Sequence, residues 1–131
     1  MPGSAEKKPL LLLGYDPIDE DHRDFMAIIE DIMDVDNVGF ATMFEALLSH
    51  TEAHFERENK LMEASGYPAM GEHRGEHARV MGEFKQFHQR VKRGLIPFGR
   101  AFVAERLLPW FELHITTMDA ALAAHLRASH H

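Results

Sequence analysis

The sequence predicts an all-α protein, an antiparallel up-down-up-down four-helix bundle with an N-terminal arm. Three observations support this prediction. Four stretches repeat apolar residues at the three- and four-residue spacing of an amphipathic helix, glycine and proline interrupt the chain between them, and no stretch alternates apolar and polar residues as a strand does. Because the connections are short, consecutive helices are expected to be antiparallel neighbours that bury their apolar stripes against one another.

Turn-forming residues delimit the first two helices. An apolar stripe over residues 19–33 is broken by the segment 34–39. A second stripe begins at Phe40 and ends at the glycine and proline of residues 66–68. The inward positions expected on these two helices are His22, Phe25, Met26, Ile29, Ile32, Met33, Phe40, Phe44, Leu47, Thr51, His54, Glu58 and Leu61.

The third helix is expected over residues 70–91 and the fourth over residues 98–126, with a bend at Pro109. Gly75 and Gly82 lie inside the third helix. Each costs about 1 kcal/mol relative to alanine, which indicates either close packing or simple tolerance. The inward positions expected on these two helices are Met70, His73, His77, Val80, Phe84, Phe87, Val91, Val103, Leu107, Trp110, His114, Met118 and Ala121.

The length of 131 residues indicates one domain, with an N-terminal arm over residues 1–17, the bundle over 18–127 and a C-terminal tail over 128–131. His130 and His131 resemble a tag remnant and are set aside. The absence of cysteine excludes disulfides and thiolate metal sites, and the net charge of -7 argues against a nucleic-acid partner. The only early apolar run is too short for a signal peptide or a membrane span, so we expect a cytoplasmic protein. Its acidic charge and single bundle suit a monomer or a weak oligomer equally well.

Side chains of the kinds that bind metals interrupt the apolar stripe of every expected helix. In an antiparallel bundle, the starts of the first and third helices meet the ends of the second and fourth helices at one end of the molecule. The rise of 1.5 Å per residue places these side chains within about one to three turns of that end, so they are expected to share one layer. They are His22, His54, Glu58, His73, His77, His114 and Asp119.

The spacing of these residues is regular except on the fourth helix. One pair on the second helix and one pair on the third lie four positions apart, so each pair projects from a single face. His114 and Asp119 are five positions apart, which is about 140° around an ideal α-helix. Either a local widening of the helix or a carboxylate that reaches around from its edge is needed to bring the two together.

The number of these residues favours a metal site over a set of core histidines. A single histidine on an apolar face is usually a core residue with a hydrogen bond. Five histidines and two carboxylates buried together without a metal would leave unpaired groups that cost several kcal/mol. Seven ligands are too many for one tetrahedral ion and suit two octahedral ions, and nitrogen and oxygen ligands suit iron. Di-iron enzymes of this architecture supply four glutamates and two histidines, so a histidine-rich set favours binding dioxygen over activating it.

Four sequence stretches carry these residues and cover about residues 15–122. They read I-D-E-D-H from Ile18 to His22, H-F-E-R-E-N-K-L-M from His54 to Met62, H-R-G-E-H from His73 to His77, and W-F-E-L-H-I-T-T-M-D from Trp110 to Asp119. One H-x-x-x-H sequence would be weak evidence, but an ordered set on four helices is specific. Together the stretches resemble the hemerythrin family, and specifically its bacterial single-domain members.

This resemblance implies a site of two iron ions joined by an oxo or hydroxo bridge. The iron with two histidine ligands would keep one position open for dioxygen. The five-residue step to Asp119 is the family's own spacing. The implied ligands are His73, His77 and His114 for one iron, His22 and His54 for the other, and Glu58 and Asp119 as bridges.

The resemblance also implies an apolar wall around the dioxygen position. For each of its residues, plain core packing stays open as the alternative. A dry pocket would slow the loss of reactive oxygen species to water. The residues expected in this wall are Phe25, Phe55, Trp110, Phe111, Ile115 and Thr116.

Three residues depart from the expected pattern or extend it. Thr116 stands where a larger aliphatic side chain is expected, and a hydroxyl that faced the site would speed autoxidation. Asn59 replaces a second acid and is expected to face outward. His50, one turn before His54, is either a donor behind the ligands or a core residue.

Reversible dioxygen binding is therefore the expected function, in storage, in delivery to an oxidase or other oxygen-using protein, or in sensing. An enzyme that reduces peroxide or nitric oxide, or turns over dioxygen, is the first alternative. No general acid stands out beside the expected open position, which weighs against an enzyme. The second alternative is an iron-handling or structural bundle.

Overall fold

The computed structural model describes residues 12–129, and every regular element in that range is helical. The all-α fold class predicted from the sequence is confirmed. Three of the four rods are single helices, and the fourth is built from five consecutive segments. The elements are α1 (Asp16–Asp34), α2 (Asn37–Ser65), α3 (Met70–Lys92) and a fourth rod of α4 (Ile96–Ala101), the π-helical η2 (Phe102–Leu107), α5 (Leu108–His114), the π-helical η3 (Ile115–Asp119) and α6 (Ala120–Ser129).

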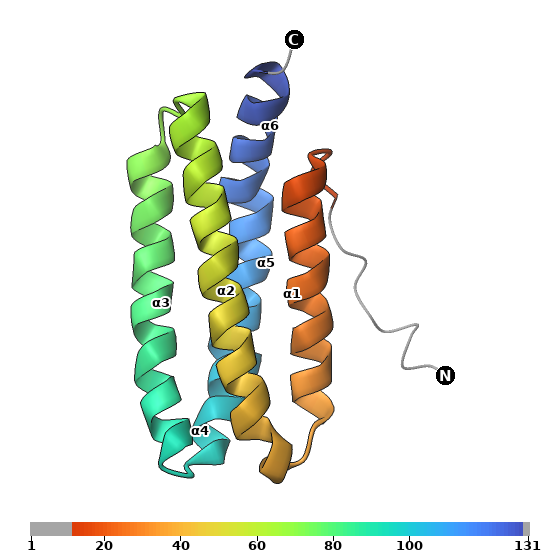
Figure 1. Ribbon diagram of the computed structural model, residues 1–131, viewed down its shortest axis with the longest axis vertical. Coiled ribbons are helices and arrows are strands. Elements are labelled where there is room, and N and C mark those ends of the chain that lie inside the picture. Colours follow the sequence, from red (N-terminus) through yellow and green to blue (C-terminus); the bar gives the residue numbers. More distant parts are fainter. Residues whose placement is uncertain (1–11, 130–131) are drawn as a thin grey trace, which may run out of the picture.

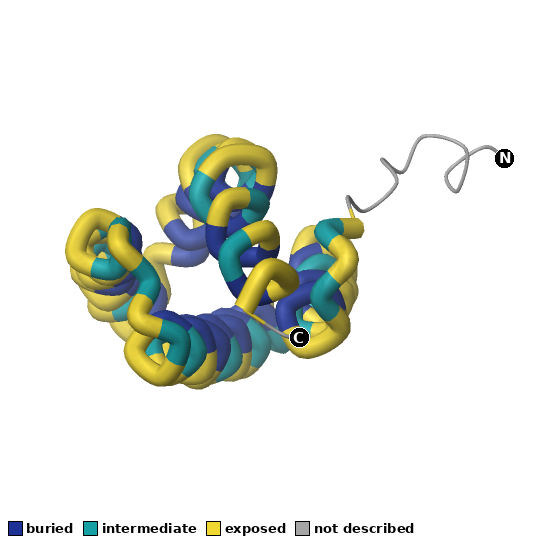
Figure 2. Tube along the Cα trace, turned by 90° about the horizontal axis from the view of Figure 1, so that it is seen from above, coloured by how far each residue is buried: buried dark blue, intermediate teal, exposed yellow. Residues whose placement is uncertain are grey.

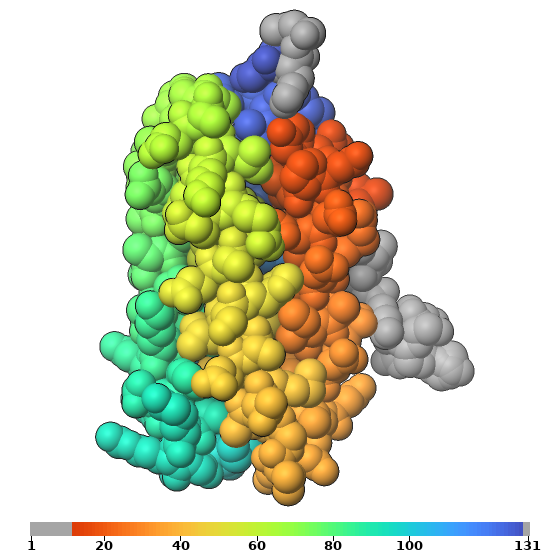
Figure 3. Space-filling model, in the orientation of Figure 1, coloured from red at the N-terminus to blue at the C-terminus, as the bar shows by residue number. Residues whose placement is uncertain are grey.

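Successive rods run in opposite directions. In Figure 1, α1 and α3 descend while α2 and the fourth rod rise. α2 packs against both α1 and α3, and Figure 3 shows these three helices side by side on one face. Seen from above in Figure 2, the buried positions turn toward the middle of the four rods and the exposed positions turn outward. The starts of α1 and α3 therefore lie at the same end of the molecule as the ends of α2 and α6.

Asp19 ties down the chain that enters α1. Its buried carboxylate accepts hydrogen bonds from the backbone N–H groups of Leu13, at 2.8 Å, and Gly14, at 3.1 Å. α1 itself begins at Asp16, with Pro17 in its first turn, where a missing N–H costs no helical hydrogen bond. Asp19 thus lies within the first helix and holds the turn that precedes it.

The arm and the tail expected from the sequence fall largely at the ends of the described range. Residues 1–11 of the arm and residues 130–131 of the tail lie outside the described residues. The last two residues assigned to the arm are helical, because α1 starts at Asp16. α6 extends to Ser129 and so includes the first two residues assigned to the tail.

Caps and left-handed glycines end the rods where the sequence indicates. The Asp36 carboxylate accepts a hydrogen bond of 2.9 Å from the Gly39 N–H and so caps the first turn of α2. Gly66, with φ of 64°, ends α2, and Gly94, with φ of 86°, follows α3. Both backbones are left-handed, a conformation that glycine adopts without a Cβ clash. The stop predicted at residues 66–68 is confirmed, and Gly94 ends the third helix in the same way.

Two separate apolar clusters fill the interior, one on either side of the predicted ligand layer. Along α1, Ile18 belongs to the small cluster, Phe25 to the large one, and His22 stands between them. The same order recurs on the last rod, where Asp119 separates Leu122 from Ile115. The small cluster is Ile18, Met62, Leu122, Ala123 and Leu126, and the large one is built mainly from Phe25, Ile29, Ile32, Phe40, Phe44, Leu47, Phe84, Phe102, Val103, Leu107 and Phe111.

The inward face of the fourth rod differs from the predicted one. The backbone N–H of Leu108 donates to Val103 O and that of Ala120 to Ile115 O, both five residues back. Each π-helical segment is wider than an α-helix and has more residues per turn. The residues after it therefore face a different direction from the one that a regular α-helix would give them. Phe111 and Asp119 are therefore buried, whereas the predicted Trp110 and Met118 are half-buried and Ala121 is exposed. On the other helices, Met33 and Leu61 were also predicted to face inward. Met33 is exposed and Leu61 is half-buried.

Close packing does not require the glycines at positions 75 and 82 of α3; the helix tolerates them. A Cβ added at Gly75 or Gly82 would meet no atom within 4 Å. Gly99 in α4 is the opposite case, because a Cβ there would lie 2.5 Å from Val91 Cγ2 and 2.7 Å from Phe40 Cε2. The interior of the bundle, not the outer face of α3, is where glycine is required.

Gly82→Ala is therefore expected to raise the free energy of unfolding by about 1 kcal/mol, because alanine gains helix propensity without a clash. Gly99→Ala is expected to lower it, because Val91 and Phe40 must move. Urea unfolding of the metal-free protein followed by circular dichroism measures both values. A Gly82→Ala variant less stable than the parent would contradict this view of α3.

Candidate metal centre

All seven predicted ligand residues converge in one buried layer. Each side chain is at most 3% exposed, so none of them is in contact with bulk water. They come from all four rods. His22 lies on α1, His54 and Glu58 on α2, His73 and His77 on α3, His114 at the end of α5, and Asp119 at the end of η3.

Local helix geometry explains how each rod contributes its residues. The pairs on α2 and α3 are four residues apart in regular α-helix, so both members project from the same face. The widened turn of η3 begins immediately after His114 and ends at Asp119. This π-helical turn brings the two side chains to one side of the rod. Of the two possibilities left by the sequence, a locally widened helix is the one that the structure shows.

One oxygen of Glu58 and one of Asp119 together face three histidines, two for each oxygen. The Nε2 atom of His73 lies 3.3 Å from Glu58 Oε1 and 3.1 Å from Asp119 Oδ1. The Nε2 atom of His77 lies 3.1 Å from the same Glu58 oxygen, and that of His114 lies 3.1 Å from the same Asp119 oxygen. These five side chains form the first group of ligand atoms within 4.8 Å of one another, which we call the five-donor position.

The other oxygen of each carboxylate faces the remaining two histidines. The Nε2 atom of His54 lies 3.0 Å from Glu58 Oε2, and that of His22 lies 2.9 Å from Asp119 Oδ2 and 3.9 Å from Glu58 Oε2. These four side chains form the second group, the four-donor position. Glu58 and Asp119 belong to both groups, so the two positions share both carboxylates.

The donor atoms fit metal coordination better than they fit one another as hydrogen-bond partners. Most of them are buried without a well-aligned hydrogen bond, despite their short mutual distances. Two ligands at right angles on an octahedral ion, each about 2.1 Å from it, lie about 3.0 Å apart. That is the spacing of most of the nitrogen–oxygen contacts here. The atoms without a partner are His54 Nε2, His73 Nε2, His77 Nε2, His114 Nε2, Glu58 Oε1, Glu58 Oε2 and Asp119 Oδ1.

The neighbouring imidazoles keep both carboxylates ionised. Burial alone would raise the pKa of Glu58, but the charge of His54 and close contacts with the surrounding histidines hold that pKa well below its usual range. Burial and the nearby Glu58 charge likewise act to raise the pKa of Asp119. The close contact with His114 and the hydrogen bond with His22 outweigh them and lower it. The carboxylates are therefore in the anionic state that binds metal.

The histidines respond in different directions. Burial lowers the pKa of His54, but the Glu58 charge and the contacts with Asp21 and Glu58 outweigh it and raise the value to about 10. The pKa of His73 is raised to about 9, since its close contacts with the Asp119 and Glu58 carboxylates outweigh burial. The pKa of His77 is lowered because burial dominates there. Without a metal, two of the imidazoles thus carry protons that a cation must displace.

Outer contacts hold two of the ligand rings from behind. The Nδ1 atom of His54 lies 3.5 Å from Asp21 Oδ2, and Arg57 binds Asp21 through two nitrogens. The Nδ1 atom of His77 lies 3.1 Å from Asn59 Oδ1. Asn59 is half-buried, so the expectation that it faces outward is wrong. The sequence contains a signal for Asp21, an acid directly before His22, but its contact with His54 depends on how α1 packs against α2.

Aromatic rings pack directly against the histidines. Phe55 stacks on His77 with ring centroids 4.0 Å apart and an angle of 4° between the ring planes. Phe111 meets His22 edge-on at 5.4 Å and lies 4.0 Å from Phe25. These three phenylalanines and Ile115 are buried, which is the location expected of a wall around the site.

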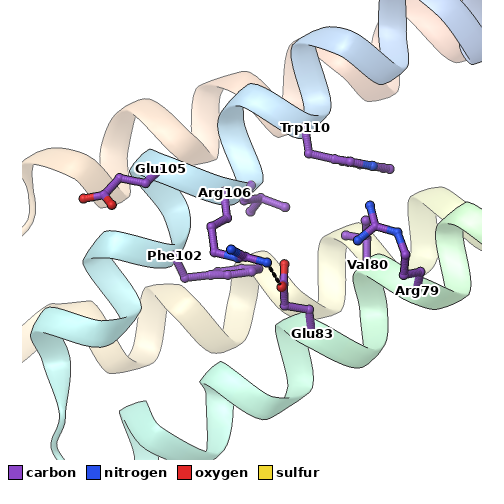
Figure 4. A pocket seen from close by; sticks show the side chains of 8 residues that line it. Arg79, Val80, Glu83, Phe102, Glu105, Arg106 and Trp110 are labelled. Atoms are coloured by element: carbon purple, nitrogen blue, oxygen red, sulfur yellow. Dashed lines mark hydrogen bonds and ion pairs between the residues drawn. The ribbon is translucent and has the colours of Figure 1, made fainter.

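Trp110 lies between the buried layer and the surface. Its ring stacks on His114 at 4.4 Å with an interplanar angle of 20°, and it is half-buried. Figure 4 shows that it also lines an open surface pocket, where Arg106 forms an ion pair with Glu83. Trp110 therefore covers one ligand ring on the side where solvent is close.

Thr116 does not belong to the wall. It is exposed, and its hydroxyl donates to the backbone carbonyls of Glu112, at 3.2 Å, and Leu113, at 3.0 Å. The resemblance placed this side chain beside the dioxygen position, but Thr116 is exposed. It comes two positions after the buried His114, about 200° around a helix, and so lies on the outer face of the rod. The hydroxyl is accordingly directed away from the ligand layer.

Three further histidines lie outside the ligand set. His50 is half-buried, its Nε2 atom lacks a hydrogen-bond partner among the described residues, and burial together with the His54 and Arg57 charges lowers its pKa. His88 stacks on Phe44 at the far end of the bundle, and His125 hydrogen-bonds to the Ser65 carbonyl. None of the three belongs to either group of ligand atoms.

The fold and the site together define a helical-bundle protein with a buried site for metal cations. A family model for the hemerythrin HHE cation binding domain matches residues 13–126, and the chain belongs to the hemerythrin family. A bacteriohemerythrin from Ralstonia nicotianae (strain ATCC BAA-1114 / GMI1000) is 33% identical over 116 residues, which are 88% of this chain and 84% of that protein. No solved structure gives a significant match. Within residues 12–129, no helix combines the length and apolar character needed to span a membrane.

Metal uptake by the metal-free protein is expected to release about two protons per chain at pH 7, because His54 and His73 are protonated below pKa values of about 10 and about 9. Since protons compete with the cation, the apparent affinity is expected to fall as the pH is lowered, by about tenfold per pH unit for each proton. Calorimetric titrations in buffers of different ionisation enthalpy measure the number released. Uptake at pH 7 with no net proton release would contradict these assignments.

Proposed function

We propose that the chain binds dioxygen reversibly at a non-haem di-iron centre. The observation that carries this proposal is the division of seven buried side chains into a five-donor and a four-donor position with two shared carboxylates. Nitrogen and oxygen donors in a chain without cysteine suit octahedral iron, with an oxo or hydroxo bridge completing the pair. Two ferrous ions held there would supply the two electrons that reversible dioxygen binding requires.

The two positions support different roles. His73, His77 and His114, with one oxygen from each carboxylate, offer five donors to one ion. His22 and His54, with the other two oxygens, offer four donors to the second ion. Because both octahedral ions share the bridge, the second keeps one coordination place that no side chain fills. We assign dioxygen to that place.

The surrounding residues support binding over catalysis. Phe25 and Phe111 lie on the side of His22, so apolar surface borders the four-donor position and disfavours water there. Apart from the proposed ligands, Asp21 is a described acid in contact with the layer, 3.5 Å from His54. Burial raises its pKa, but the contacts with His54 and Arg57 outweigh burial and hold the value at about 2, so it is ionised and cannot act as a general acid. We propose a binding protein that serves in oxygen storage, in delivery to an oxygen-using protein or in sensing.

The direct test is to load the protein anaerobically with ferrous iron and then admit dioxygen. We expect about two irons per chain and a visible charge-transfer absorption band that disappears when dioxygen is removed. Irreversible bleaching with rapid consumption of peroxide would favour an enzyme. Retention of much less than two irons would favour an iron-handling bundle.

His54→Ala is expected to abolish most of this reversible band, because it removes one of the two histidines at the four-donor position. His88→Ala is the matched control, since His88 lies against Phe44 and belongs to neither ligand group. The band of the control is expected to equal that of the parent protein. Equal losses in the two variants would refute the site assignment.

A further inference from the structure

Two ligand rings, one at each metal position, are supported from behind by partners of different charge. His54, at the four-donor position, has the Asp21 carboxylate 3.5 Å from its Nδ1 atom. His77, at the five-donor position, has the Asn59 amide oxygen 3.1 Å from its Nδ1 atom. The first contact has the length of an ion pair and the second that of a hydrogen bond. One ring therefore faces a negative charge and the other a neutral dipole.

Asp21 is fixed in place by a neighbouring arginine. Arg57 Nε donates to Asp21 Oδ2 at 2.9 Å, and its terminal nitrogen donates to Asp21 Oδ1 at 2.5 Å. This two-point contact joins α1 to α2 and restricts the carboxylate to the face where His54 lies. The Asp21 side chain is 14% exposed, so water screens its charge only in part.

The difference in charge matches the difference in the number of ligands. A negative charge behind an imidazole increases the electron donation of the ring to a bound cation and fixes the ring orientation. An amide fixes the ring in the same way but adds no net charge. The negatively charged partner is thus found at the position that has fewer protein donors.

We propose that Asp21 is a positioning residue that strengthens cation binding at the four-donor position through His54, while Asn59 supports the five-donor position without adding charge. The proposal rests on the proposed function only in requiring two bound metal ions. Asp21 makes up for the missing fifth donor, so both ions are retained although their ligand sets are unequal.

The experiment is release of ferrous iron to a strong chelator under anaerobic conditions, from the loaded full-length protein. Asp21→Asn keeps the size of the side chain and removes its charge. We expect one of the two irons to leave at least about tenfold faster than in the parent protein, which is the lower end of the effect of such outer partners. The second iron is expected to leave at the rate measured for the parent protein. A crystal structure of the variant after one iron has been removed is expected to lack the iron between His22 and His54.

A reciprocal variant tests the same idea from the other side. Asn59→Asp places a charge behind His77 and is expected to slow the release of the other iron by about tenfold. Glu83→Gln is the matched control, because Glu83 also pairs with an arginine, Arg106, between two rods but touches no ligand ring. Its release rates are expected to equal those of the parent protein.

The outcomes separate this proposal from the proposed function. Acceleration confined to one iron in Asp21→Asn, with unchanged circular dichroism and an unchanged unfolding midpoint of the metal-free chain, supports the positioning role. Equal acceleration of both irons, unchanged rates in Asp21→Asn and Asn59→Asp, or the same effect in Glu83→Gln overturns it. Reversible dioxygen binding with unchanged release rates would overturn the positioning role alone. Accelerated release of one iron in Asp21→Asn, in a protein that does not bind dioxygen reversibly, would overturn the proposed function alone. Failure of the parent protein to bind two metal ions would overturn both proposals.

Discussion

The rest of the structure depends on the burial of five imidazoles and two carboxylates in one layer of the bundle. Such groups cost several kcal/mol when they are removed from water without full pairing. In the metal-free chain they neutralise one another only partly, because the carboxylates stay ionised and some of the histidines hold protons. A pair of cations at the two proposed positions would satisfy the unpaired nitrogen and oxygen atoms at the same time. Metal binding and the stability of the native bundle would then be linked in this protein.

The scaffold meets this constraint by dividing its core. The large apolar cluster lies on one side of the ligand layer and the small cluster on the other, so the rods are held together above and below the polar atoms. Aromatic rings then restrict the imidazoles. Phe55 lies flat on His77 and Trp110 lies flat on His114, which limits the rotation of both rings before any cation arrives. A ligand set that is already oriented loses less conformational entropy on binding a metal.

Most of the fold and the convergence of the seven predicted ligand residues in one buried layer could be predicted from the sequence, because both depend on periodicity. The four apolar stripes specify helices, and ligand types at inward positions near matching helix ends specify a common layer. The face of the last rod could not be predicted in this way, since the π-helical segments break the period of 3.6 residues. For this reason Ala121 was expected inside but faces outward. Thr116 was expected in the wall from the family resemblance alone, and it is exposed.

The outer partners of the ligands were also beyond sequence reasoning. Asp21 reaches His54 across the contact between α1 and α2, and Asn59 reaches His77 across the contact between α2 and α3. Such pairs depend on the register between helices, which the pattern of a single helix does not specify. Arg57 gave a partial signal, because it lies three residues after His54 and so shares its side of α2.

The central claim is that these seven side chains hold two cations and not one. A crystal structure of the iron-loaded protein, with anomalous scattering recorded at the iron absorption edge, tests it most directly. The account predicts two peaks about 3.5 to 4 Å apart, one beside His73, His77 and His114 and the other beside His22 and His54, with Glu58 and Asp119 contacting both. A single peak, or His22 and His54 without iron, would contradict it.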